Sequence, residues 1–253
     1  MAMQTEYLRG KPISLMVLDY GLFKVHANGR IIGICGFLVH TDEEEWVLID
    51  TGFPRHYADD PQTAATQDGL GSFGEVLILR HANLPDAQLA LAGISKSDLT
   101  MLILTHSHID HVGGIGDFPG VPIILAKAER ALPRPLYFGK RQPMEWPMAE
   151  YLTIDGDCDI GPGFRALLSP GHAPGQLAFL IDLPQTGPVL IASDAISRPA
   201  EVDERFDTAP DPDLACKSAA RLLALADDVG AFVIYGHCPV QWPNLKKSPD
   251  FYA

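Results

Sequence analysis

The stretch LTHSHIDHVGG, at residues 104–114, is the most informative part of this sequence. It follows an apolar run at residues 101–104 and gathers four side chains of metal-binding type: His106, His108, Asp110 and His111. Neutral imidazole and carboxylate groups are ligands that borderline and hard divalent cations prefer. The alternative is a polar loop that happens to be rich in histidine. Because three of the nine histidines cluster here beside an aspartate, the pattern favours a metal or catalytic site.

Three further polar residues follow apolar, strand-like runs later in the chain. His172 lies in SPGHAPG (169–175), Asp194 in ASDA (192–195) and His237 in YGHC (235–238). Loops at strand ends are where folds place catalytic groups, although a single histidine in such a loop is more often structural. Together with the first motif, these residues supply five histidines and two aspartates. That is enough to hold two metal ions that share one carboxylate.

The hydrophobic pattern predicts strands mixed with helices. Strand-like residues at 13–25 and 31–40 flank Asn28-Gly29, which predicts a hairpin, and a third strand at 46–49 runs into Asp50-Thr51-Gly52. The chain is therefore expected to open with an antiparallel meander. Further strands are expected at 100–104, 121–125, 166–169, 177–181, 189–192 and 231–235, and helices at 85–92, near Asp110, from Lys127 and at 212–227. This order predicts a layered α/β sandwich, and the lack of a linker-like break predicts a single domain over residues 1–253.

Two segments show no clear periodicity. Residues 54–74 have acidic pairs, Thr, Gln and Gly with little apolar content, which predicts a surface excursion acting as a lid or a partner contact. Residues 133–147 contain four prolines together with Tyr137, Phe138 and Trp146. This composition is typical of an ordered surface loop or of a pocket wall, and the sequence leaves both interpretations open.

Charge and cysteine usage limit the classes of partner and compartment. With 19 basic and 32 acidic residues the net charge is −13, which argues against a nucleic-acid partner because such proteins need a basic surface. The four cysteines (Cys35, Cys158, Cys216 and Cys238) are scattered without a C-x-x-C pair, which favours reduced thiols in a cytoplasmic protein. No secretory signal and no apolar run near the roughly 18 residues of a membrane span is visible, so no membrane partner is expected. The oligomeric state stays open, with a homodimer among the alternatives.

The ordered set of H-x-H-x-D-H, a later His, an Asp and a final His resembles the metallo-β-lactamase-fold hydrolases. The resemblance runs from the first strand to His237 and implies an αββα four-layer sandwich that holds two divalent metal ions, most commonly zinc. It assigns His106, His108 and His172 to one ion, and Asp110, His111 and His237 to the other, with Asp194 bridging both. Asp50 of the D-T-G turn matches a carboxylate that orients a ligand histidine from behind.

Within that superfamily the chain is most similar to the N-acyl-homoserine-lactone lactonase branch. The similarity rests on SPGHAPGQ (169–176), SDA (193–195) and the D-P-D-x-A lead (211–215) into the last helix. It implies a dinuclear zinc hydrolase that opens a small-molecule lactone with a hydroxide bridging the metals, and in which Asp194 or Asp110 relays a proton to the leaving alkoxide. Many members have Tyr three residues after the bridging Asp, but this chain has Ser197. Ser197 is the candidate pocket donor, Tyr137, Tyr235 or a water could compensate, and the identity of the lactone stays open.

Other functions compete with lactone hydrolysis. Glyoxalase-II-like thioester hydrolysis is close, but it would bring a basic cluster toward the C-terminus, where only Lys246-Lys247 is present. A di-metal redox or sensor protein is the alternative from a different class; such members carry an added flavin domain and replace certain ligand histidines by carboxylates, whereas this chain keeps all five histidines. A purely structural zinc site would be a closed, often cysteine-rich set of four ligands, unlike this one.

Overall fold

A computed structural model describes residues 7–253 of the chain. Its first sheet begins with the antiparallel meander that the sequence predicts, formed by β1 (Pro12–Val25), β2 (Ile31–Thr41) and β3 (Trp46–Ile49). The β1–β2 turn contains Gly29 with φ of 69°, a left-handed conformation that glycine adopts at little cost. The predicted hairpin is therefore confirmed.

Parallel strands extend this sheet on the far side of β3. They are β5 (Leu99–Ile103), β6 (Ile123–Ala126) and β7 (Tyr151–Ile154), while β4 (Gly74–Ile78) pairs with β1 at the opposite edge. The order is β4-β1-β2-β3-β5-β6-β7. The sequence predicted neither β4 nor β7. Both lie at edges, where β4 is largely exposed and β7 is largely half-buried, and neither carries the apolar alternation that marks a strand with one buried face.

The second sheet has five strands in the order β12-β11-β10-β9-β8. They are β8 (Cys158–Gly161), β9 (Phe164–Leu168), β10 (Leu177–Leu183), β11 (Gly187–Ser193) and β12 (Phe232–Tyr235). The first four pair antiparallel, and β12 lies parallel to β11 at one edge. The short edge strand β8 was not predicted, and the other four match the expected strands.

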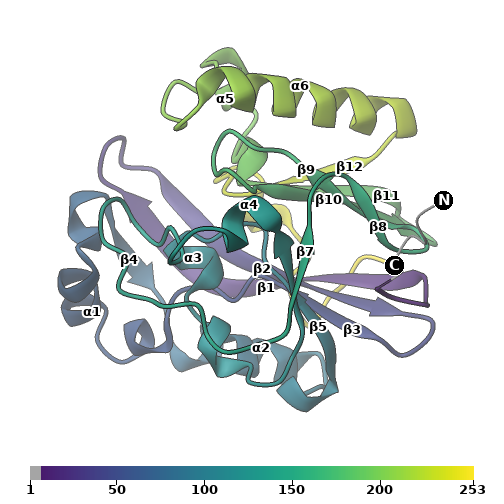
Figure 1. Ribbon diagram of the computed structural model, residues 1–253, viewed down its shortest axis with the longest axis horizontal. Coiled ribbons are helices and arrows are strands. Elements are labelled where there is room, and N and C mark those ends of the chain that lie inside the picture. Colours follow the sequence, from purple (N-terminus) through teal and green to yellow (C-terminus); the bar gives the residue numbers. More distant parts are fainter. Residues whose placement is uncertain (1–6) are drawn as a thin grey trace.

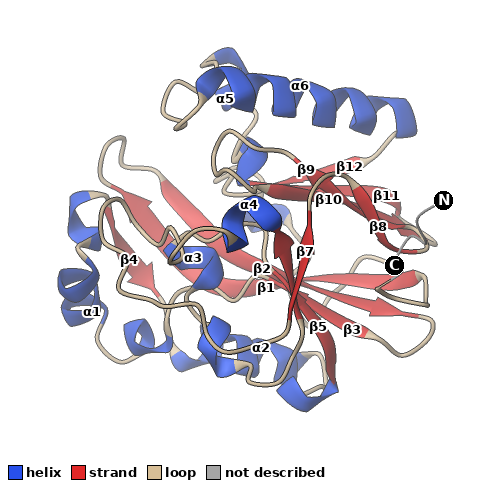
Figure 2. Cartoon of the chain, viewed as in Figure 1, coloured by secondary structure: helices blue, strands red, loops and turns tan. Residues whose placement is uncertain are grey.

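Helices cover the outer faces of the two sheets (Figures 1 and 2). The long helix α6 (Pro212–Val229) begins at Asp211, whose side chain accepts from the Leu214 backbone N–H at 3.0 Å, and ends at Gly230 with φ of 67°. The α-helices of the other segments are α1 (Pro61–Asp68), α2 (Pro85–Leu91), α3 (Ile109–Val112), α4 (Lys127–Arg130) and α5 (Ala200–Asp203). The 3-10 turns are η1 (Arg55–Ala58), η2 (Leu70–Ser72), η3 (His81–Asn83), η4 (Lys96–Asp98), η5 (Ile115–Asp117), η6 (Asp194–Ile196) and η7 (Trp242–Asn244). None of the helices among the described residues is long and apolar enough to cross a membrane.

Three buried apolar clusters show the layering. Successive β2 residues point to opposite faces: Leu38 joins the cluster under the outer helices, whereas Val39 joins the cluster between the two sheets, and both are fully buried. On the second sheet, Leu190 packs in a third cluster with Leu222 of α6. The arrangement is helices, sheet, sheet and helix, which confirms the predicted αββα four-layer sandwich.

The two irregular segments are more closely packed than their sequences suggest. Residues 54–74 form η1, α1 and η2 and bury Tyr57 completely, so the prediction of a surface excursion is wrong for its inward side. Residues 133–147 contain no helix or regular strand, but Tyr137 is buried in the apolar cluster under the outer helices, which also contains Tyr57, and Trp146 packs against that cluster. Main-chain bonds join Tyr137 to Ser107 and Ile109, beside the first histidine motif. This segment is therefore a wall of the region that surrounds the motif.

Candidate metal centre

The seven residues predicted as metal ligands come together at one edge of the sandwich. His106, His108, Asp110 and His111 follow β5, the last two on the short helix α3. The second sheet supplies the rest: His172 from the β9–β10 loop, Asp194 from the end of β11 and His237 from the end of β12. Both sheets thus contribute to one cluster, as expected from polar residues at strand ends.

Three imidazoles form the first half of the cluster. The Nδ1 atom of His108 lies 2.9 Å from Nε2 of His106 and 2.9 Å from Nε2 of His172. Burial, reinforced by neighbouring histidines, lowers the pKa of His106 and His108 well below the usual value, and burial also lowers the pKa of His172. These rings are therefore neutral, with ring nitrogens free to act as ligands, and their nitrogens lie within 4.8 Å of one another.

Asp110, His111 and His237 form the second half. Oδ2 of Asp110 lies 3.4 Å from Nε2 of His237 and 3.6 Å from Nε2 of His111. Burial lowers the pKa of His111, but Asp110, Asp50 and Asp194 outweigh it and raise that pKa to about 10. Burial also lowers the pKa of His237, but the charge of Asp194 outweighs this effect and raises that pKa to about 9. The nearby carboxylates therefore favour the positively charged form of both rings in the metal-free protein.

Asp194 lies between the two halves and faces each with a different oxygen. Its Oδ2 lies 3.3 Å from Nε2 of His172. Its Oδ1 lies 3.2 Å from Nε2 of His237 and 3.6 Å from Nε2 of His111. Burial raises the pKa of Asp194, but the three histidines outweigh it and hold that pKa well below the usual value, so the group is a carboxylate. One carboxylate therefore presents an oxygen to each half.

Several buried polar atoms of this cluster face one another at ion-pair distance without forming a hydrogen bond. Nε2 of His111, Nε2 of His237 and Oδ1 of Asp194 are buried and make no hydrogen bond within residues 7–253. Orphaned buried polar atoms are rare in folded proteins and require a bound species or strain to account for them. Imidazole and carboxylate donors that converge from several sides fit divalent cations of the zinc class.

Further groups fix the orientation of these rings from behind. Oδ2 of Asp50 lies 2.8 Å from Nδ1 of His111, while the Thr105 backbone N–H and hydroxyl donate to the same carboxylate at 2.8 Å each. The carbonyl oxygen of Gly33 lies 2.9 Å from Nδ1 of His237. These contacts leave the Nε2 atoms of both rings directed at the cluster. The D-T-G carboxylate thus lies where the resemblance implies, behind His111.

Glu129, which was not predicted from the sequence, connects two of the histidine loops. Glu129 is completely buried on α4, and its carboxylate accepts from the Ser107 hydroxyl and, at 3.1 Å, from the Gly175 backbone N–H. Ser107 lies between His106 and His108, and Gly175 lies in the loop of His172. Burial raises the pKa of Glu129, while these bonds oppose the rise. The only signal in the sequence is a carboxylate three residues after a buried strand, and this signal is weak because short helices commonly carry acidic residues.

The predicted pocket donors have different surroundings. Ser197 follows η6 and is half-buried; its backbone N–H donates to Glu201 at 2.7 Å and its carbonyl accepts from the His237 backbone N–H at 2.9 Å. The hydroxyl of Tyr137 donates to the buried carboxylate of Asp68 at 3.1 Å, so it is not available as a substitute for the missing tyrosine. Tyr235 lines a pocket to which none of the seven predicted ligands contributes.

Comparisons with known proteins agree with this geometry. The model of the metallo-beta-lactamase superfamily matches residues 32–237. N-acyl homoserine lactonase of Bacillus thuringiensis is 31% identical over 223 residues, covering 85% of each chain, and N-acyl homoserine lactonase AttM of Azorhizobium caulinodans is 30% identical over 241 residues, covering 85% of this chain and 86% of its own. An N-acyl homoserine lactone hydrolase solved with N-hexanoyl-L-homoserine at its catalytic metal centre superposes with a TM-score of 0.82 at 26% identity, covering 97% of this chain and 100% of its own. From the fold, the cluster and these matches, the chain belongs to the metallo-beta-lactamase superfamily.

Proposed function

We propose that this protein is a metal-dependent hydrolase that opens a small-molecule lactone. The observation that carries the proposal is the Asp194 carboxylate, which presents one oxygen to the three-histidine half and the other to the half that contains His237. A shared carboxylate between two ligand sets fits a dinuclear site better than a single ion. The similar N-acyl homoserine lactonases, aligned over 85% of this chain, support a cyclic ester as the substrate.

The ligand sets follow from the two halves of the cluster. His106, His108 and His172 would hold one ion; Asp110, His111 and His237 would hold the other, and Asp194 would contact both. We propose zinc for both ions because an all-imidazole and carboxylate set suits it. When bound, two such ions lower the pKa of a water toward neutrality and polarise the ester carbonyl.

The chain's own groups divide the remaining tasks. Asp110 keeps 19% of its side chain exposed, against 8% for Asp194, so Asp110 is the better placed to pass a proton to a departing alkoxide. Asp50 and Gly33 hold His111 and His237 in position, which avoids reorientation during turnover. Ser197 is proposed as a donor to the bound lactone, at the position where many relatives of this branch have tyrosine.

Metal analysis combined with a lactone panel tests this proposal. The purified protein should contain about two zinc ions per chain and hydrolyse at least one of several acyl-homoserine and aromatic lactones. Asp194→Ala should lose metal and activity with little loss of folded structure. The exposed His81, which contacts Asp59 at 3.2 Å, provides the matched control, since His81→Ala should change neither.

The rival functions give different results in the same experiment. Two zinc ions with turnover of thioesters but of no lactone would assign the site to a glyoxalase-II-like reaction. Iron with reversible redox activity would assign it to the redox class. An Asp194→Ala variant that keeps both metals and full activity would remove the shared carboxylate from the scheme.

A further inference from the structure

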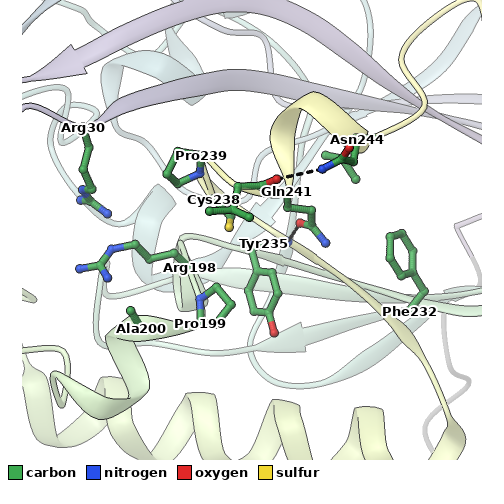
Figure 3. A pocket seen from close by; sticks show the side chains of 12 residues that line it. Arg30, Arg198, Pro199, Ala200, Phe232, Tyr235, Cys238, Pro239, Gln241 and Asn244 are labelled. Atoms are coloured by element: carbon green, nitrogen blue, oxygen red, sulfur yellow. Dashed lines mark hydrogen bonds between the residues drawn. The ribbon is translucent and has the colours of Figure 1, made fainter.

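A second pocket lies beside the proposed metal centre, at the β12 edge of the five-stranded sheet. Its volume is about 780 Å³, within the usual range for small-molecule sites. Residues 198–200 form one wall directly after Ser197, and residues 238–241 form another directly after His237 (Figure 3). None of the seven predicted metal ligands lines it, so this pocket is separate from the cluster.

The body of the pocket is apolar and open to solvent. Val240 keeps 79% of its surface exposed and Phe232 keeps 39%, although both are large hydrophobic residues. Tyr235 and Leu245 complete this part of the lining. Exposed apolar side chains that gather around a hollow mark a binding surface, because their burial by a ligand is favourable.

Two arginines, Arg30 from the end of the β1–β2 turn and Arg198, lie at the same end of this pocket (Figure 3). Nε and Nη1 of Arg30 and Nε of Arg198 are buried without a hydrogen-bond partner among the described residues. Glu204 accepts from Nη2 of Arg198, and Glu201 is bonded to the Ser197 backbone, so these carboxylates leave the three nitrogens unsatisfied. Burial and then the charge of Arg198 lower the pKa of Arg30, whereas the charges of Glu201 and Glu204 oppose this shift.

We propose that this pocket binds an organic monocarboxylate with an apolar chain, with its carboxylate between Arg30 and Arg198 and its chain along Phe232 and Val240. A carboxylate matches the forked donors of guanidinium groups and would satisfy the buried nitrogens that the protein leaves unpaired. An apolar chain would cover the exposed hydrophobic wall. The site borders the proposed metal centre through Ser197 and His237 but does not depend on metal or on lactone hydrolysis.

Calorimetric titration of the purified, metal-containing protein with octanoate tests the site, with 1-octanol as the neutral probe of similar length. Octanoate should bind with one-to-one stoichiometry, and octanol at least about tenfold more weakly, because it cannot pair with the guanidinium groups. Arg30→Gln should weaken octanoate binding about tenfold or more. Arg9→Gln, at a side chain that is 81% exposed outside the pocket, is the matched control and should leave binding unchanged.

Two further variants separate this site from the metal centre and from self-association. Asp194→Ala should bind octanoate like the wild type; loss of binding there, with binding retained in Arg30→Gln, would assign the carboxylate to the metals and overturn the proposal. Val240→Asp places a negative charge, which repels the octanoate carboxylate, on an exposed wall of the pocket. Because Val240 is exposed, this substitution should leave the fold intact while it weakens octanoate binding. Equal binding of octanol and octanoate would identify the pocket as a purely apolar surface. A wild-type dimer in sedimentation that Val240→Asp dissociates would identify it as an interface between two copies.

Discussion

Replacing Glu129 with Gln should separate the positioning of the metal centre from the stability of the fold. The Glu129 carboxylate accepts from Ser107 in the loop of His106 and His108, and from Gly175 in the loop of His172. An amide can accept only one of these bonds and turns its own NH₂ group toward the other donor. One buried, charge-assisted hydrogen bond is therefore lost, a cost of about 1.5–3 kcal/mol.

Folding stability and zinc affinity should respond to this substitution to different degrees. Part of the folding cost is offset, because Gln removes the penalty of burying a carboxylate whose pKa burial raises. No such offset applies to the ligand geometry, and loss of a group that orients metal ligands typically weakens metal binding about 10–100-fold. Zinc competition against a chromophoric chelator measures that affinity, and urea unfolding of the metal-free protein measures stability.

Glu45 offers the control for this prediction. Glu45 lies in the turn between β2 and β3, and its buried carboxylate accepts from the Gly10 backbone N–H at 2.9 Å with one oxygen and from the Arg9 backbone N–H at 3.1 Å with the other. Glu45→Gln should cost a similar amount of unfolding free energy and leave zinc affinity at the wild-type value. If both variants lose zinc affinity equally, or if Glu129→Gln retains it fully, Glu129 does not position the histidine loops.

Three further predictions concern the surroundings of the cluster. Asp50→Ala removes the acceptor behind His111 and should weaken zinc binding about 10–100-fold, measured by the same competition; unchanged affinity would contradict the orienting role. In the metal-free protein, the raised pKa values of His111 (about 10) and His237 (about 9) should stabilise the fold fully below pH 6.5. This stabilisation should disappear as the pH rises through 9 and 10, which a falling urea midpoint would show. A urea midpoint that does not change with pH over this range would refute the prediction. Tyr137→Phe leaves the carboxylate of Asp68 with one donor fewer and should cost about 1–3 kcal/mol in unfolding free energy while zinc content stays at the wild-type level.

The sequence could reveal the centre because its residues are concentrated in short motifs. His106, His108, Asp110 and His111 share one loop, and the remaining histidines and Asp194 each follow a strand whose apolar run is easily recognised. Strand-like composition around Asn28-Gly29 also indicated the opening meander, and helical periodicity indicated α6. The edge strands β4, β7 and β8 escaped because their partly exposed residues lack the alternation that buried strands impose.

Features that depend on tertiary contacts could not be predicted. Glu129 reaches Ser107 and Gly175 across 22 and 46 positions of sequence, and nothing in its local pattern distinguishes it from an exposed acidic residue. The second pocket combines Arg30 with residues that follow Ser197 and His237, a juxtaposition that only the packed sandwich creates. The hydrogen bond from Tyr137 to Asp68 likewise depends on the packing of α1 beside the loop that contains Tyr137.

The division of the cluster between the two sheets has a consequence for how the chain would respond to its ions. His106, His108, Asp110 and His111 belong to the first sheet, whereas His172, Asp194 and His237 belong to the second. Each proposed ion would therefore cross-link the two sheets, in addition to the apolar layer between them and the hydrogen bonds from Gly175 to Glu129 and between His237 and Gly33. Neither sheet alone has a complete ligand set, so metal uptake would require that both sheets have assembled. Saturating zinc would therefore raise the free energy of unfolding of the whole sandwich.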